Sequence, residues 1–172
     1  MPWIENIPLE NVATGRHHDC GANSMLIQIS DHDMAFPTPK HTFKEIHQFT
    51  FLDVEEEEGI TTTGDGRTID LSEFAITDEQ AEQLVRLLQH AWENRMNVVV
   101  HCHAGICRSG AVCEIGVMMG FGDCERFRSP NLLVKHKMMR LLGWTYDNED
   151  STHSWRADYR QHLTDKKGGQ DA

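Results

Sequence analysis

A cysteine and an arginine with five residues between them, Cys102 and Arg108, stand where the sequence predicts a loop between a strand and a helix. The three valines at 98–100 are typical of a strand buried on both faces. A loop of small residues follows, and a helix is expected to begin near Ser109. Such a loop curls so that its backbone N–H groups point at one centre. The stretch therefore predicts a binding site for a tetrahedral dianion, with a thiol beside it.

The residue types at the ends of this loop suit nucleophilic attack on a phosphoryl group. Cys102 must be a thiolate to attack, whereas a free thiol has a pKa of about 8.5. The N-terminal dipole and unpaired N–H groups of the following helix favour an anion and lower that pKa. Arg108 adds a permanent charge, and its planar fork holds two phosphoryl oxygens at once.

Three further residues have expected supporting roles in the loop. Gly105 allows the backbone to turn where a side chain would obstruct it. Ser109 is expected to donate its hydroxyl to the sulfur and ease its departure. His101, at the end of the strand, is expected to hydrogen-bond to loop backbone and hold the cysteine in place.

The pattern His101-Cys102-x-x-Gly105-x-x-Arg108-Ser109 resembles the signature of the cysteine-dependent protein tyrosine and dual-specificity phosphatases, and every fixed position is present. A weaker resemblance extends over residues 25–143, to small dual-specificity-like enzymes of bacteria and phages. It implies hydrolysis of phosphotyrosine, and of phosphoserine or phosphothreonine, through a cysteinyl-phosphate, with no cofactor and no metal. The phosphate-binding positions that it implies are His103, Ala104, Gly105, Ile106, Cys107 and Arg108.

This mechanism also needs a carboxyl group that protonates the leaving oxygen and later activates water. The family supplies it from a loop directly after a strand, and residues 46–52 read as a strand that leads to Asp53. Asp53 is therefore the first candidate for the general acid. It lies 49 residues before Cys102, farther than is usual in the family. A turn-forming aspartate at a strand end is the structural alternative.

The segment after Asp53 offers a second candidate acid. Residues 60–69 have two threonine-containing arms around a Gly-Asp-Gly turn, which predicts a β-hairpin and is interpreted as an insertion. If the hairpin instead belongs to the acid loop, Asp70, 32 residues before Cys102, becomes the acid. The acidic run Glu55–Glu58 predicts a solvated loop, with selection of basic peptides as the functional alternative.

The remaining periodicities predict one α/β domain with a central, mostly parallel mixed sheet flanked by helices, and with the active loop at the carboxyl end of a central strand. It spans residues 1–164, begins with an irregular segment at 1–24 and ends in a disordered tail at 165–172. Thr77 and Gln80 form a predicted capping box at a helix start. The other expected elements are a strand at 25–30, a proline-containing loop at 37–39, a buried helix after the phosphate loop, a helix at 131–142 and a helical segment at 155–163.

Composition narrows the classes of partner. The chain has 172 residues, a net charge of −11 and five cysteines, an odd number that favours a reducing compartment over a disulfide framework. The negative charge argues against nucleic acid and anionic membranes as partners. No stretch reads as a signal peptide or membrane span. A cytoplasmic, monomeric enzyme acting on phosphorylated proteins is the expectation.

Several alternative interpretations remain at the level of sequence. The chain is a catalytically weak phosphate- or phosphopeptide-binding module if the acid is missing. A metal-binding fold built on the His101-Cys102-His103 and Cys107 region is disfavoured, because consecutive residues on an extended segment point to opposite faces. His17, His18, Asp19 and Cys20 are interpreted as a surface loop, since no paired ligand spacing follows. Cys107 is either a resolving cysteine for oxidised Cys102 or a small residue filling the place of serine.

Overall fold

Five parallel strands form one sheet, in the order β3-β2-β6-β1-β7, and its central strand ends at Cys102. The computed structural model describes residues 1–55, 60–62 and 64–144. The elements of this part are β1 Trp3–Pro8, α1 Leu9–Thr14, β2 Ser24–Ser30, β3 Glu45–Thr50, β4 Ile60–Thr62, β5 Thr68–Asp70, η1 Ser72–Phe74, α2 Asp78–Glu93, β6 Asn97–Cys102, α3 Arg108–Met119, β7 Gly122–Asp123 and α4 Leu132–Leu141. The predicted α/β class is confirmed, and the main sheet is entirely parallel.

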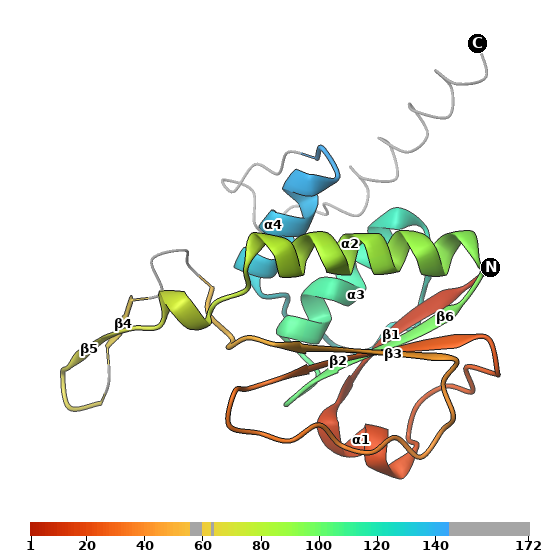
Figure 1. Cartoon of the computed structure of the whole chain (residues 1–172), viewed down its shortest axis with the longest axis horizontal. Coiled ribbons are helices and arrows are strands. Elements are labelled where there is room, and N and C mark those ends of the chain that lie inside the picture. The colour runs from red at the N-terminus through yellow and green to blue at the C-terminus, as the bar shows by residue number, and fades with distance from the viewer. Residues whose placement is uncertain (56–59, 63, 145–172) are drawn as a thin grey trace.

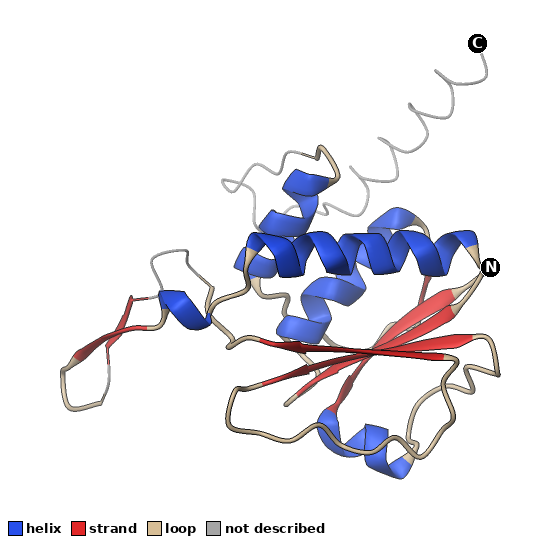
Figure 2. Cartoon of the chain, in the orientation of Figure 1, coloured by secondary structure: helices blue, strands red, loops and turns tan. Residues whose placement is uncertain are grey.

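The helices cover the sheet unequally. α2, α3 and α4 lie on one face and the short α1 lies on the other (Figures 1 and 2). The larger apolar core fills the space under α2, α3 and α4, while a smaller one packs under the α1 side around Ile7, Leu26 and Val99. Because both faces are covered, the valines of β6 are fully buried, as the apolar run predicts.

α2 places its apolar side on the sheet and begins at the predicted capping box. The Thr77 side chain accepts a hydrogen bond from the Gln80 amide, and the Gln80 side chain accepts one from the Thr77 amide. Its buried residues recur at helical spacing: Ala81, Leu84, Val85, Leu88 and Ala91. α3, in contrast, is buried almost all round, as expected for the helix that follows the loop.

The expectation of an irregular segment at residues 1–24 is wrong. β1 lies in the sheet between β6 and β7, and α1 follows it directly. The apolar run that marks a buried parallel strand is interrupted here, since Glu5 and Asn6 occupy the middle of β1. Both are fully buried, at 1% and 0% exposure. Their polar side chains have specific partners, and this explains why the hydrophobic pattern missed the strand.

The β-hairpin between the two candidate acids is confirmed. β4 and β5 pair antiparallel as a separate two-stranded sheet. The hairpin projects from the body of the molecule, beyond η1 (Figure 1). Glu55 is exposed. Glu56–Glu58, the expected helical segment at 155–163 and the expected tail at 165–172 lie outside the described residues.

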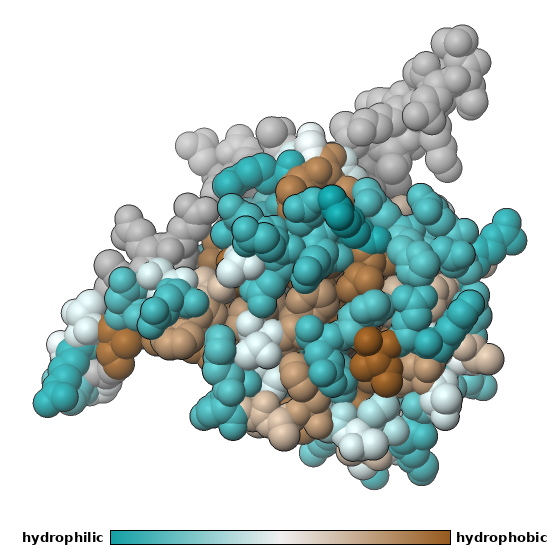
Figure 3. Space-filling view, viewed as in Figure 1, coloured by the Kyte–Doolittle hydropathy of each residue, from teal (hydrophilic) through white to brown (hydrophobic). Residues whose placement is uncertain are grey.

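Hydrophilic residues dominate the face over α2 (Figure 3). Across the parts of the chain that the structure describes, no helix combines the length and apolar character needed to span a membrane.

Candidate phosphate-binding active site

Cys102 is the last residue of the central strand, and its sulfur is the obvious candidate nucleophile. Its side chain is almost fully buried, at 2% exposure. The sulfur lies 3.1 Å from the hydroxyl oxygen of Ser109, in the first turn of α3. The predicted contact between thiol and hydroxyl is therefore present. The loop therefore brings together two side chains that are seven positions apart in the sequence.

The carbonyl groups of the loop point outward, toward the flanking segments. The carbonyl of His103 accepts a hydrogen bond from the Leu9 amide at 3.1 Å, that of Ile106 from the Ser129 amide at 3.2 Å, and that of Cys107 from the Asn131 amide at 2.9 Å. Within the described residues, no amide of the loop 103–107 donates a backbone hydrogen bond. These N–H groups are thus free to face the interior of the loop, as an anion-binding nest requires.

Gly105 is required for both its conformation and its lack of a side chain. Its φ is +74°, and a Cβ at this position would lie 2.3 Å from the backbone of Ile7 and Pro8. Its carbonyl accepts a hydrogen bond from the side-chain amide of Asn6 at 2.7 Å. The same amide also donates to the carbonyl of Phe127 at 3.1 Å. Asn6 in β1 therefore ties the loop to the segment after β7.

Arg108 is held by partners that the sequence motif does not contain. Its Nη1 donates to Asp31 Oδ1 at 2.6 Å and to the carbonyl of Phe51 at 2.8 Å. Asp31 directly follows β2, and Phe51 directly follows β3. The buried Nε of Arg108 has no hydrogen-bond partner in the described structure. One edge of the guanidinium is fixed by the protein, while this N–H remains available to an anion.

His101 fits its predicted role as a support of the loop. The ring is fully buried, and its Nδ1 lies 3.3 Å from the carbonyl of Cys102, to which it is placed to donate. Burial lowers the pKa of His101 to about 4, and the charge of Arg108 contributes in the same direction. The imidazole is therefore neutral near pH 7 and acts as a hydrogen-bonding spacer, not as a charge beside the sulfur.

The two candidate acids have different surroundings. Asp53 accepts a hydrogen bond from the side-chain amide of Asn131 at 2.6 Å, and that amide also donates to the carbonyl of Val54. Asn131 also donates its backbone amide to the loop carbonyl of Cys107, which places Asp53 at the edge of the loop. Burial raises the pKa of the Cys107 thiol, and the nearby Asp53 carboxylate adds to this shift.

Asp70 lies on the hairpin and has a local partner. It is the last residue of β5, it is exposed, and its Oδ1 accepts a hydrogen bond from the Ser72 amide at 2.9 Å. This backbone hydrogen bond lowers the pKa of Asp70. The contact is a turn-stabilising one. The described structure therefore joins Asp53, and not Asp70, to the loop.

A buried ion-pair cluster supports the loop from behind. Arg128 donates from Nε to Glu114 Oε1 at 2.5 Å and forms a two-pronged pair with Asp123 at 3.0 Å. The Cβ of Arg128 would lie 3.0 Å from a Cβ added at Gly110, so a side chain there would crowd it. Glu114 is the one acidic residue of α3 that the helix pattern left unexplained. Through its pair with Arg128, Glu114 fixes the segment whose Ser129 and Asn131 amides bind the loop carbonyls.

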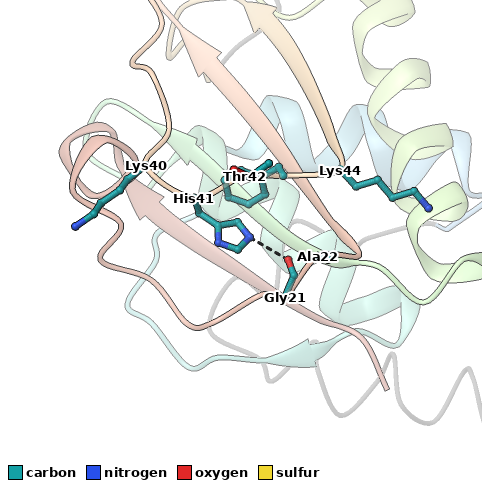
Figure 4. A pocket seen from close by; sticks show the side chains of 7 residues that line it. Gly21, Ala22, Lys40, His41, Thr42 and Lys44 are labelled. Carbon is teal, nitrogen blue, oxygen red and sulfur yellow. Dashed lines mark hydrogen bonds between the residues drawn. The ribbon is translucent and has the colours of Figure 1, made fainter.

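An open pocket lies at the opposite end of the sheet. Gly21, Ala22 and residues 40–44 line it, at the amino ends of β2 and β3. His41 Nε2 lies 2.9 Å from the carbonyl of Gly21, and the side chains of Lys40 and Lys44 extend away from the pocket (Figure 4). Ligands of parallel α/β sheets bind at the carboxyl ends of the strands. The loop between β6 and α3, and not this pocket, is at that end.

Residues 68–119, from β5 through the loop to the end of α3, match a family model described as "Polymorphic toxin system, DSP-PTPase phosphatase". The resemblance to the dual-specificity-like phosphatases is confirmed. The matched segment of this superfamily contains Cys102, Arg108 and Ser109. It begins at Thr68, so that it includes Asp70 and leaves out Asp53.

Among solved structures, the chain is similar to OH1 from the Orf virus, described as a tyrosine phosphatase that displays distinct structural features and triple substrate specificity. The identity is 13% and the TM-score is 0.47, with 82% of this chain and 83% of the viral chain covered. No curated protein matches this sequence significantly.

Proposed function

We propose that this chain is a cysteine-dependent phosphatase that hydrolyses phosphotyrosine in proteins, with phosphoserine and phosphothreonine as further substrates. One observation carries the proposal. The loop carbonyls are bound by the flanking segments, so the loop amides are left for an anion beside the Cys102 sulfur. Arg108, with one edge fixed and Nε unpaired, supplies the opposite charge. The family match supports the same class of reaction.

The first half-reaction transfers the phosphoryl group to the enzyme. The Cys102 thiolate attacks phosphorus, an S–P bond forms, and the bond from phosphorus to the leaving oxygen breaks. Asp53 donates a proton to that oxygen, which leaves as the free hydroxyl of the substrate side chain. The loop amides and Arg108 stabilise the charge on the three equatorial oxygens. The product is a cysteinyl-phosphate.

The second half-reaction releases phosphate. Asp53, now a carboxylate, accepts a proton from a water molecule that attacks phosphorus, and the S–P bond breaks. The sulfur leaves as a thiolate. The Ser109 hydroxyl, 3.1 Å from this sulfur, donates a hydrogen bond that stabilises the developing charge. Inorganic phosphate is the final product, and the enzyme returns to its starting protonation state.

The loop composition favours a substrate with one phosphate group. The variable positions His103, Ala104, Ile106 and Cys107 include no lysine or arginine. A polyphosphorylated headgroup needs further cations close to the reacting phosphate, because each additional dianion must be neutralised. A phosphorylated side chain of a protein carries only the one group that Arg108 and the loop amides hold.

Phosphate release from aryl phosphate and from a phosphopeptide panel tests this function. Cys102→Ser and Arg108→Lys should each remove nearly all turnover, since the first removes the thiolate and the second the two-pronged anion contact. Vanadate should inhibit the wild-type protein because it mimics the crowded phosphorus centre. Unfolding curves of both variants serve as the control for folding. Phosphopeptide binding without turnover in the wild type, or wild-type turnover in Cys102→Ser, would refute the proposal.

A further inference from the structure

Three metal-ligating side chains from separate parts of the chain converge at the β7 edge of the sheet. Glu5 lies in β1, His18 follows α1, and Cys124 follows β7. One ligand atom of each lies within 4.8 Å of those of the other two. None of the three belongs to the proposed active site. The surface-loop interpretation of His18 from sequence did not include Glu5 or Cys124.

Glu5 presents its two carboxylate oxygens to different partners. Oε2 lies 2.5 Å from His18 Nδ1 and accepts a hydrogen bond from the His18 amide at 3.1 Å. Oε1 lies 3.5 Å from Arg126 Nε, an ion pair at longer range. The side chain is 1% exposed, so its charge is costly unless it is paired. Oε2 is thus turned toward the cluster, while Arg126 holds the other oxygen.

The electrostatics of the cluster favour a cation. Glu5 brings a buried carboxylate to within 4.8 Å of the ligand atoms of His18 and Cys124. A divalent cation would pair with this carboxylate and displace the thiol proton of Cys124, as happens when a thiol coordinates a metal.

We propose that Glu5, His18 and Cys124 bind a thiophilic divalent cation of the zinc type. The donor set is one carboxylate oxygen, one imidazole nitrogen and one thiolate sulfur, which suits Zn²⁺ and excludes Mg²⁺ and Ca²⁺ as preferred ions. The His18 side chain is 62% exposed, so solvent has access for a fourth, water ligand. Arg126 on Oε1 then acts as the outer partner that orients the Glu5 carboxylate.

Metal binding exchanges the thiol proton of Cys124 for the cation and involves no change of oxidation state. The Cys124 thiol releases its proton to solvent as the metal–sulfur bond forms, and His18 coordinates through a neutral ring nitrogen. Apparent affinity should therefore rise with pH. Because the neighbouring Asn6 and the segment after Cys124 both hold the phosphate loop, the bound cation would also tie together two supports of that loop.

Cobalt provides a direct readout, since a cysteine thiolate bound to Co²⁺ gives a sulfur-to-metal charge-transfer band in the near ultraviolet. The titration uses full-length Cys102→Ser protein, so that the active-site thiolate cannot contribute. We expect one equivalent of Co²⁺ to produce the band and Zn²⁺ to displace it. His18→Ala should weaken binding by at least about 10- to 100-fold, the range seen when even outer partners are lost. Cys124→Ser should abolish the band.

His41→Ala and Cys107→Ser are the matched controls, because they remove another histidine and another partly exposed cysteine. Both should retain the band and the affinity. Absence of the band in Cys102→Ser protein, or its persistence in Cys124→Ser, would overturn the proposal. If Cys124→Ser fails to fold, His18→Ala decides the question, since its side chain is largely in solvent. The cobalt titration measures metal binding and the aryl phosphate assay measures turnover, so either proposal can fail while the other holds.

Discussion

Two carboxylates differ in how they are placed to serve as the general acid. Asp53 shares Asn131 with the loop, and its carboxylate lies beside Cys107. Asp70 instead stabilises the turn into η1 from an exposed position. The proton donor must reach the leaving oxygen bound above the loop. This shared contact with the loop is why we propose Asp53 as the acid, although the family match includes only Asp70.

Substitution of the two acids separates them. Asp53→Asn should slow turnover by roughly 10²- to 10⁴-fold and remove one limb of the pH profile, because positioned proton transfer is lost. Asp70→Asn should change turnover little. Steady-state kinetics over a pH series, with an aryl phosphate, provides the measurement. The opposite ranking would show that the hairpin belongs to the acid loop.

Cys107 is a candidate resolving cysteine that would protect Cys102 from irreversible oxidation. Peroxide converts a thiolate to sulfenic acid, and a neighbouring thiol then forms a disulfide with loss of water. Cys107 lies in the same loop, five residues after Cys102, and it is partly exposed. Wild-type protein should lose activity to peroxide and regain it with reductant, with a Cys102–Cys107 link detected by mass spectrometry.

The matched variant is Cys107→Ser, which keeps a small polar residue in the loop. It should remain active before treatment and become irreversibly inactivated by peroxide. Equal recovery of activity in both proteins would favour the simpler role of Cys107 as a space-filling residue, because disulfide geometry across a short loop is restrictive.

Local residue patterns could be predicted from the sequence, and contacts across the chain could not. Cys102, Gly105 and Ser109 follow from their spacing, because a seven-residue loop fixes its own geometry. Asp31 meets Arg108 across 77 positions, and Asn131 meets Asp53 across 78. Asp31 precedes a proline-containing loop with no periodic pattern. The only signal for Asn131 was its place as a helix-starting residue.

At the scale of elements, β1 is both an interior strand of the sheet and a support for the loop after β6. Its Asn6 amide donates to Gly105 and to Phe127, and its Ile7 and Pro8 backbone lies against Gly105. The strand therefore fixes the shape of the loop from below. A polar residue in a buried strand has a cost that these two hydrogen bonds offset.

Asn6→Ala should destabilise the protein by about 1–3 kcal/mol, because two carbonyl groups lose their donor in a buried environment. It should also reduce kcat, since the loop amides lose their alignment. Urea unfolding and steady-state kinetics measure the two effects. Asn11→Ala is the matched control: its side chain makes one exposed hydrogen bond, to the carbonyl of Arg16, and its loss should cost little. Comparable losses in the two variants would contradict this role of Asn6.

Elements with a clear period were predicted well, whereas polar or very short ones were missed. The α2 capping box and the β4-β5 hairpin follow from local chemistry. β1 was missed because buried Glu5 and Asn6 interrupt its apolar run. β7 has only two residues, Gly122 and Asp123, and pairs with Trp3 and Ile4. No window of local sequence contains enough residues to reveal such a strand.

For the whole molecule, burial of His101 makes folding stability depend on pH. The folded protein keeps the ring neutral down to about pH 4, whereas the unfolded chain protonates it near pH 6.5. The unfolded state thus binds more protons between these values, so that stability is full above pH 6.5 and falls as the pH decreases toward 4. This difference in pKa corresponds to about 3 kcal/mol of unfolding free energy.

His101→Asn retains a donor near the carbonyl of Cys102 and removes the titrating ring. Between pH 7 and pH 4.5, the unfolding free energy of this variant should decrease less than that of the wild type. The difference between the two decreases should be about 2–3 kcal/mol. Urea denaturation at the two pH values gives this difference directly. Parallel pH dependences in both proteins would show that other groups control the acid sensitivity.

The strand order also determines when the loop is completed during synthesis. β1 is made first, yet its two sheet neighbours, β6 and β7, are made long after it. The loop carbonyls are bound by residues on both sides of it in the chain, from Leu9 to Asn131. A nascent chain that has only just exposed Cys102 therefore lacks the donors that orient the loop. The Cys102 thiol therefore leaves the ribosome before the groups that orient its loop, and the proposed active site is complete only once residue 131 has also emerged.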